Sequence, residues 1–266
     1  MNNWYTFEPA DDYHARSRSG EFLSSHLMDD FRRSPILYKK KISGEIAPED
    51  STAFLFGRAA HSLILEGLSA FQKEFMVSDG PVNEKTGKVF GKTSAVYQEW
   101  LAEQDKDVIS LNMWQDIAKL NEAVDDNKEA KKLLKNGFAE AVVRAKLFDV
   151  PCQIRMDWFN PDEGLVDLKT CAELRWFEAD ARRFGYIRQL AFYRMVIRAA
   201  AGITVPVHII AVEKAEPYAC GVWYLTEEVL DAAELQIESI LKKYKNCIEN
   251  NLWPTGYETI RILDEM

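Results

Sequence analysis

RMDWFNPDEGLVDLKT, residues 155–170, contains two strand-like runs separated by a turn at 160–164. The turn consists of Asn160, Pro161, Asp162, Glu163 and Gly164. Turn-forming residues between alternating apolar runs favour a tight reversal of the chain. The stretch therefore predicts an antiparallel β-hairpin. Three charged residues, Asp157, Asp167 and Lys169, nevertheless lie inside the predicted strands. Charged groups in a sheet are costly unless something uses them, so their position needs an explanation.

The three charged residues can be brought together by the hairpin. Side chains alternate along a strand, so Asp167 and Lys169 share one face, and Asp157 lies on the neighbouring strand. Two close carboxylates repel each other unless a cation lies between them or one is protonated. Carboxylates and the backbone carbonyl of Leu168 suit Mg²⁺, which also recruits phosphate oxygens. Such a metal polarises a phosphodiester, and Lys169 can orient or deprotonate a water, so the trio indicates phosphodiester hydrolysis.

A simpler interpretation of the same trio remains open. An ordinary surface hairpin with an Asp–Lys cross-strand pair gains up to about 1 kcal/mol from that pair. An Asp followed later by Asp-x-Lys also arises by chance in many sequences. The trio alone does not decide between a catalytic hairpin and a surface hairpin.

Composition limits the class of protein. The chain has 266 residues, of which 47% are hydrophobic and 28% charged, as expected for a globular protein with a real core. No apolar run reaches the roughly 18 residues that span a bilayer, and the N-terminus lacks a signal-peptide pattern, so we expect a cytoplasmic protein with no membrane partner. The net charge of −9 does not favour nucleic-acid binding at a distance, but local patches decide contacts. Basic residues cluster in 31–41 and 175–198.

The pattern along the chain predicts a mixed α/β fold. Helices are expected at 24–33 (N-cap Ser24 or Ser25), 53–67, 94–104, 112–135, 174–200 with an interruption at Gly185, and 227–250. Strands are expected at 139–148, 150–159 and 164–170 as an antiparallel meander, and then at 205–214 and 218–225. Residues 78–93 read as a long exposed loop. This order indicates one domain over 1–266, with a mainly helical part (1–135) and a core (136–266) in which helices flank a mixed sheet.

Seven short motifs occur in an order that resembles the PD-(D/E)xK nucleases, and within them the RecE-type exonucleases of phage and prophage recombination. They are DYHA (12–15), SPILY (34–38), GRAAH (57–61), AE (139–140), RMD (155–157), DLKT (167–170) and YIRQLAFY (186–193). GRAAH is similar to the Gly-x-x-x-His motif of these nucleases, and YIRQLAFY contains their Gln-x-x-x-Tyr. The resemblance covers nearly the full length. It implies a restriction-endonuclease-like α/β core with an N-terminal helical extension.

The resemblance also implies roles for the matching residues. The implied metal ligands are His61, Asp157, Asp167 and the carbonyl of Leu168, and the implied catalytic lysine is Lys169. Glu140 is implied to position a second metal or a water, and Gln189 and Tyr193 to line the site and contact the DNA strand. Helical spacing is compatible with two of these placements, because Gly57 and His61, and likewise Gln189 and Tyr193, are four residues apart and share a face.

The activity implied by the resemblance is that of a Mg²⁺-dependent exonuclease, with Mn²⁺ as a substitute. It would degrade linear double-stranded DNA from the 5′ end and leave a 3′ overhang for a single-strand annealing protein. Two alternatives stay open: a structure-specific or restriction-like endonuclease of the same fold, and a catalytically silent DNA-binding module. The complete set of His61, Asp157, Asp167 and Lys169 speaks against a silent module.

The cysteines and the basic residues lead to further expectations. The spacing of the four cysteines is not that of a metal site, and it does not match the iron–sulfur cluster of some RecB-like nucleases. We therefore expect no cluster and buried free thiols at Cys152, Cys171, Cys220 and Cys247.

The basic residues supply candidates for phosphate contact. Not all of the arginines around the helix at 174–200 can face the DNA; the candidates are Arg182, Arg183, Arg188, Arg194 and Arg198, with Lys85, Lys88 and Lys92 in the loop. Because a lone subunit at −9 repels DNA, and because similar enzymes close into toroids, we expect a homo-oligomeric ring.

Overall fold

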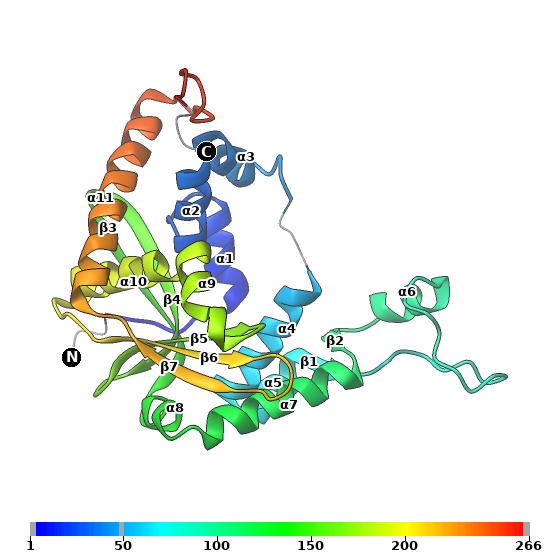
Figure 1. The fold of residues 1–266 in the computed structure, drawn as a ribbon. Coiled ribbons are helices and arrows are strands. Elements are labelled where there is room, and N and C mark those ends of the chain that lie inside the picture. Colours follow the sequence, from blue (N-terminus) through cyan, green and yellow to red (C-terminus); the bar gives the residue numbers. More distant parts are fainter. Residues whose placement is uncertain (1–3, 48–50, 263–266) are drawn as a thin grey trace.

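A computed structural model describes residues 4–47 and 51–262. In it a five-stranded sheet lies between two layers of helices (Figure 1). The strands are β3 (Phe138–Leu147), β4 (Val150–Asn160), β5 (Gly164–Cys171), β6 (Val207–Glu213) and β7 (Cys220–Tyr224). Their limits lie within a residue or two of those expected, so the predicted mixed α/β sheet is confirmed.

The strand order is β3-β4-β5-β6-β7. The first three strands form the predicted antiparallel meander. β6 then joins β5 in parallel, and β7 closes the sheet antiparallel to β6. A parallel neighbour requires a crossover, and the helical run between β5 and β6 supplies it. β5 is thereby a central strand, which is why its apolar residues are buried on both faces.

One face of the sheet is covered by the crossover and by the C-terminal helix. The elements are η2 (Leu174–Trp176), α9 (Phe177–Phe184), α10 (Tyr186–Ala201) and α11 (Glu227–Asn250). Gly185 separates α9 from α10 in a left-handed conformation (φ 76°), which is the predicted interruption. Apolar residues such as Leu190, Ile209 and Ile237 fill this layer; we call it the α10-side core.

The opposite face is covered by helices from the first half of the chain. They are α4 (Thr52–His61), the π-helix η1 (Ser62–Glu66), α5 (Leu68–Glu74), α7 (Leu111–Asp126) and α8 (Lys128–Leu133). Ile117, Leu168 and Ile210 belong to this layer, which we call the α7-side core. Ile209 and Ile210 are neighbours in β6 and pack on opposite faces, as strand alternation requires.

The helical run expected at 112–135 is present, but it is not continuous. The structure has two helices there, because the side chain of Asn127 caps the second one. Its Oδ1 accepts hydrogen bonds from the backbone N–H groups of Glu129 (3.1 Å) and Ala130 (3.0 Å). Its amide also donates to the carbonyl of Cys220 in β7 at 2.9 Å. An Asn that satisfies two free helix N–H groups favours a new helix start over continuation.

The N-terminal extension consists of three short helices, α1 (Ala10–Arg18), α2 (Ser25–Arg33) and α3 (Pro35–Ile42). The expected N-cap of α2 is confirmed as Ser24, whose hydroxyl accepts from the N–H of Leu27. The sequence did not predict α1. Pro35 stands at the first position of α3, where its missing N–H has no helical partner to lose.

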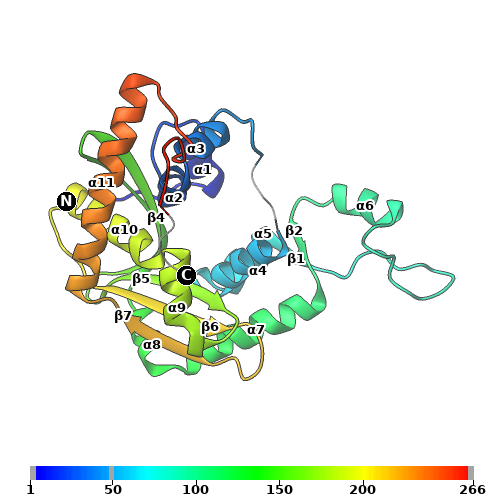
Figure 2. The same ribbon diagram turned by 45° about the horizontal axis from the view of Figure 1, so that its top comes forward.

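Residues 78–106, which we call the arm, leave the body between two strands that the sequence did not predict. These are β1 (Phe75–Val77) and β2 (Asp107–Ile109), a parallel pair of three residues each. The arm carries α6 (Ala95–Ala102) and projects away from both helical layers (Figures 1 and 2). The expected exposed loop at 78–93 forms its outer part.

None of the described helices combines the length and apolar character that crossing a bilayer requires. Three of the cysteines are buried, Cys152, Cys171 and Cys247, and Cys220 is partly buried. The absence of an iron–sulfur cluster stays a prediction.

Candidate active site

The meander opens where the charged residues lie. β4 and β5 pair as far as Trp158 and Val166, and the next pair in that register would be Asp157 with Asp167. The Asp157 carboxylate accepts a hydrogen bond from the backbone N–H of Leu168 at 2.9 Å instead. The N–H and C=O groups of one strand residue point to the same edge. The Leu168 carbonyl therefore also faces the gap between the two strands.

Glu140 marks the same position on β3. It adopts a left-handed conformation (φ 62°), which is uncommon for a residue with a side chain. Phe138 and Ala141 both pack in the α10-side core whereas Ala139 packs in the α7-side core, so the alternation of side chains slips at Glu140. Strained backbone of this kind persists where surrounding structure imposes it, often at functional sites. The slip places the Glu140 carboxylate beside Asp157.

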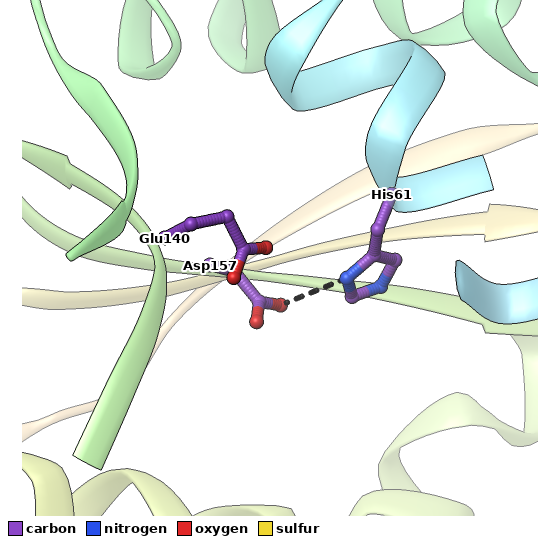
Figure 3. A group of neighbouring side chains, drawn as sticks. All are labelled: His61, Glu140 and Asp157. Carbon is purple, nitrogen blue, oxygen red and sulfur yellow. Dashed lines mark ion pairs between the residues drawn. The ribbon is translucent and has the colours of Figure 1, made fainter. Parts of the chain in front are cut away.

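His61, Glu140 and Asp157 form a compact group that could hold a metal ion. One potential ligand atom from each lies within 4.8 Å of the others. Nδ1 of His61 lies 3.6 Å from a carboxylate oxygen of Asp157 (Figure 3). His61 comes from the last residue of α4 and the two acids from β3 and β4. The structure thus brings together three of the residues singled out in the sequence.

Burial shapes the charges of this group. Burial is the main reason why the pKa of Glu140 is raised to about 8. The nearby Arg155 guanidinium lowers this pKa, and the Asp157 carboxylate raises it. Arg155 forms an ion pair with Glu140 at 2.7 Å. Burial lowers the pKa of His61, while the Asp157 carboxylate raises it. A neutral imidazole is the form that binds metals.

Asp167 and Lys169 lie on the α10-side of the same gap. The Asp167 side chain is buried, with the Lys169 ammonium 2.7 Å from one oxygen. Neither oxygen accepts a well-oriented hydrogen bond from any residue that the structure describes. Burial raises the pKa of Asp167 to about 7, with Lys169 lowering it and Asp157 raising it. A buried carboxylate with so few partners is unusual and calls for an explanation.

The expected ligands form two adjoining sets. Asp157 lies with His61 and Glu140, and Asp167, whose carboxylate interacts with that of Asp157, pairs with Lys169. That Asp157 and Asp167 share one metal stays a prediction. Electrostatics accounts for the pairing of Asp167 with Lys169, since an ammonium two residues away on the same face is the nearest positive charge. Burial lowers the pKa of Lys169, but the Asp167 and Asp157 carboxylates outweigh it and leave the pKa raised.

Helix α10 covers the α10-side of the gap with polar groups. Lys169 lies over the ring of Tyr186, 5.0 Å from its centroid. Gln189 donates from Nε2 to the Tyr193 hydroxyl at 3.4 Å. Tyr193 is 5% exposed, and burial raises its pKa. Of the two residues expected to line the site, Gln189 is therefore the one that is partly open to solvent.

The first turn of α2 reaches the same region. The Ser25 hydroxyl is buried beside the Tyr193 hydroxyl and has no well-oriented hydrogen-bond partner in the described part of the chain. Partial loss of hydration, and then the Lys169 ammonium, lower the pKa of His26, although its side chain is exposed to solvent. Helix N-termini carry free N–H groups and positive potential. The α10-side of the gap is therefore suited to an anion.

The five arginines around α9 and α10 have different surroundings. Arg194 has no exposed side-chain surface and forms ion pairs with Glu227, Asp231 and Glu234 of α11. It is thus removed from the set of possible DNA contacts, because three carboxylates already occupy it. The others are paired as well: Arg188 with Asp29, Arg198 with Glu234, and Arg182 with Glu178, while Arg183 lies over the ring of Phe184.

Sequence reasoning missed three residues of the site. Arg155 lies two residues before Asp157 in β4, a spacing that would have placed it on the same strand face. Tyr186 precedes Gln189 by three residues, so helical spacing groups it with Gln189 and Tyr193. Ser25 had only its helix-start pattern as a signal, and that pattern says nothing about a neighbouring strand.

The donor set fits a hard divalent cation. Carboxylates and a backbone carbonyl suit Mg²⁺ and Mn²⁺, and one imidazole is better tolerated by Mn²⁺ than by Mg²⁺. The two under-bonded oxygens of Asp167 would gain a partner from such an ion. The residues present therefore match the divalent-metal expectation, although they do not choose between the two ions.

Comparisons with known proteins agree with this fold. Among curated protein sequences no match is found. A crystal structure of a protein from Eubacterium rectale, named "Putative exonuclease", superposes with a TM-score of 0.70 at 19% identity, and the match covers 98% of this chain and 96% of that one. A family model described as "PDDEXK-like domain of unknown function" (DUF3799) matches residues 24–266. The chain therefore belongs to this PDDEXK-like family.

Proposed function

We propose that the chain is a metal-dependent exodeoxyribonuclease that hydrolyses phosphodiester bonds of linear double-stranded DNA. One observation carries the proposal: a buried, under-bonded Asp167 beside Lys169 lies next to the group of His61, Glu140 and Asp157. Perturbed, incompletely paired charges gather where a protein does chemistry. Membership of a PDDEXK-like family supports the same reaction class.

The residues have distinct roles in this proposal. His61, Asp157, Asp167 and the Leu168 carbonyl would hold Mg²⁺ or Mn²⁺, which polarises the phosphodiester and acidifies a bound water. Lys169 orients the attacking water, because its ammonium lies at the edge of the gap beside Asp167. Glu140, which lies in the compact group with His61 and Asp157, would position a second cation or a water. Gln189 and Tyr193 line the site and contact the DNA strand.

An anion-binding surface next to the metal group supports DNA as the substrate. The first turn of α2, the Ser25 hydroxyl and the Gln189 amide all lie around the Tyr193 hydroxyl. A phosphate at the solvent-facing edge of this group would accept a hydrogen bond from the partly exposed Gln189 amide, and the buried Ser25 and Tyr193 hydroxyls lie behind it. One phosphate of the strand could be held there while its neighbour meets the metal.

Digestion from an end, rather than within the duplex, rests on the RecE-type resemblance of the motifs. The name of the Eubacterium rectale protein is compatible with it. On the same basis we propose 5′-to-3′ digestion in the cytoplasm, 3′ overhangs handed to a single-strand annealing protein, and a homo-oligomeric ring. Closed symmetry would gather the local basic surface of a chain at −9 around the DNA.

The test is digestion of linear duplex with Mg²⁺ and with Mn²⁺. Separate 5′ and 3′ end labels report the polarity, and a closed circular duplex serves as the control. We expect early loss of the 5′ label from the linear duplex and no cut in the circle. Cleavage of the circle would indicate an endonuclease instead, and no cleavage of either substrate would leave a silent DNA-binding module.

A further inference from the structure

The arm is an ordered extension with its own turn. Val82 and Val89 form a β-bridge, and the N–H of Asn83 donates to the carbonyl of Lys88 at 2.8 Å. The Asn83 side chain accepts from the N–H of Lys85 at 2.9 Å, which closes an Asx turn. Gly87 turns the chain with a positive φ of 65°. The tip of the arm, residues 82–92, is therefore built on a defined hairpin at 82–89.

The inner part of the arm is fixed to the layer that carries His61. Phe75 and Ile109, at its two roots, are buried in the same α7-side core as Ala60, the residue before His61. Near the roots, the Asp79 carboxylate also accepts from the backbone N–H of Leu111 at 3.0 Å. The roots of the arm are thus fixed to the same helical layer as His61, the proposed metal ligand.

The tip carries positive charge that the protein does not neutralise. Lys85, Lys88 and Lys92 are all exposed, and none forms an ion pair with a carboxylate in residues 4–47 or 51–262. Glu84 is the only acid between 82 and 92. A cluster of three unpaired ammonium groups is notable on a chain with 42 acidic and 33 basic residues. Local basic surface of this kind attracts negatively charged partners even where the net charge of the protein is negative.

We propose that the tip of the arm binds phosphates of the DNA duplex at a distance from the cleavage site, through Lys85, Lys88 and Lys92. This inference rests on the proposed function, and it adds a second contact that lengthens the footprint on the substrate. Lysines bind phosphates as flexible point charges and fix the register of a protein on DNA. A two-residue bridge gives little stability in water, so a bound duplex would also hold the hairpin.

A second copy of the chain is the competing occupant, and charge argues against it. A second subunit of the proposed ring could pair with the lysines, but its 42 acidic residues are interspersed with 33 basic ones. Duplex DNA carries a denser and more regular array of negative charge, and contacts to it release counterions. The small residues at the tip, Thr86 and Gly87, also leave the backbone free to approach a phosphate.

The experiment compares two variants that lose the same charge. One carries Lys85→Gln, Lys88→Gln and Lys92→Gln in the arm. The control carries Lys242→Gln, Lys243→Gln and Lys245→Gln on α11, on the side of the molecule away from the arm (Figures 1 and 2). Binding of labelled duplexes of graded length is measured by fluorescence anisotropy in Ca²⁺ at several salt concentrations. Mg²⁺-dependent hydrolysis of bis(p-nitrophenyl) phosphate reports the metal site alone.

We expect the arm variant to bind long duplexes roughly tenfold more weakly, with a salt slope smaller by about 0.9 for each phosphate that the arm no longer neutralises. Short duplexes, the small diester and the α11 control should be unaffected. The inference would be overturned if the arm variant bound duplexes of every length as tightly as the wild type, or if the α11 control lost as much affinity as the arm variant. In either case, cleavage by the wild type would leave the proposed function intact. An arm variant that sediments as a smaller assembly yet keeps its duplex affinity would assign the tip to a second copy. A wild-type chain that neither binds nor cleaves duplex would overturn both proposals.

Discussion

Asp167 and Arg194 are both buried charged side chains near α10, but their surroundings differ. The Arg194 guanidinium forms three ion pairs at 2.5 to 2.7 Å, with Glu227, Asp231 and Glu234. The Asp167 carboxylate has the Lys169 ammonium at 2.7 Å and no well-oriented hydrogen bond within the described residues. One charge is fully paired by the protein, and the other is not.

The difference separates structure from function. A buried charge costs free energy unless partners compensate it, and breaking a compensated pair is strongly destabilising. Arg194 meets that condition and ties α10 to α11. Asp167 does not meet it, so the fold carries a cost there that a bound cation would remove. The comparison therefore predicts opposite outcomes when each side chain is replaced.

The largest effect is expected for Asp167→Asn. The substitution keeps the shape of the side chain but removes a proposed metal ligand, so the cleavage rate should fall by about 10²- to 10³-fold, the size associated with losing a group that stabilises the transition state. The free energy of unfolding should stay equal or rise, because the repulsion between the Asp167 and Asp157 carboxylates disappears while Asp157 remains near Lys169. Cleavage rates and urea unfolding of the same preparations check both expectations. A rate near that of the wild type would contradict the assignment of Asp167.

Lys169→Ala should lower turnover by roughly 10²- to 10⁴-fold, the range for a group that handles a proton or water in the transition state. Metal affinity should remain, because the proposed ligands His61, Asp157 and Asp167 are untouched. Single-turnover cleavage and calorimetric titration with Mn²⁺ separate the two quantities. If weak metal binding were the main defect, Lys169 would be a supporting group for Asp167 and not the group that orients the water.

Arg194→Met is expected to act in the opposite way. Removing the guanidinium leaves Glu234, which is 13% exposed, with Arg198 as its remaining partner, and should reduce the free energy of unfolding by about 3 kcal/mol. Cleavage by the folded fraction should not change, because Arg194 has no exposed surface. Urea unfolding and rates corrected for folded protein test this. A fully folded but inactive variant would show that the two clusters are coupled through α10.

The hairpin of residues 155–170 was predictable because its signals are local. Alternation and turn residues define β4 and β5 without knowledge of the rest of the chain. The opening between the strands was not predictable in this way. It depends on the Asp157 carboxylate replacing a backbone partner at Leu168 and on the left-handed conformation of Glu140. Both arise where three neighbouring strands meet at the same level of the sheet, which no local pattern in the sequence records.

Arg194 illustrates the same limit for charges. The sequence of α10 presents several arginines at helical spacing, and nothing within it marks one as buried. The partner carboxylates belong to α11, which follows two further strands. Asn127 is a milder case, because its capping role has a local signal, yet the run on either side of it is helical enough to conceal the break.

The smallest predicted effect lies within the Arg194 cluster and sharpens the comparison. Glu227 is 54% exposed and Glu234 is 13% exposed, although both pair with the same guanidinium. Solvent screens the Glu227 pair, so Glu227→Gln should cost less than about 1 kcal/mol of unfolding free energy. Glu234 also pairs with Arg198, so Glu234→Gln should cost more and should couple to Arg194→Met in a double-mutant cycle. Equal costs for the two substitutions would mean that burial does not set the strength of these pairs, and the contrast drawn between Arg194 and Asp167 would lose its physical basis.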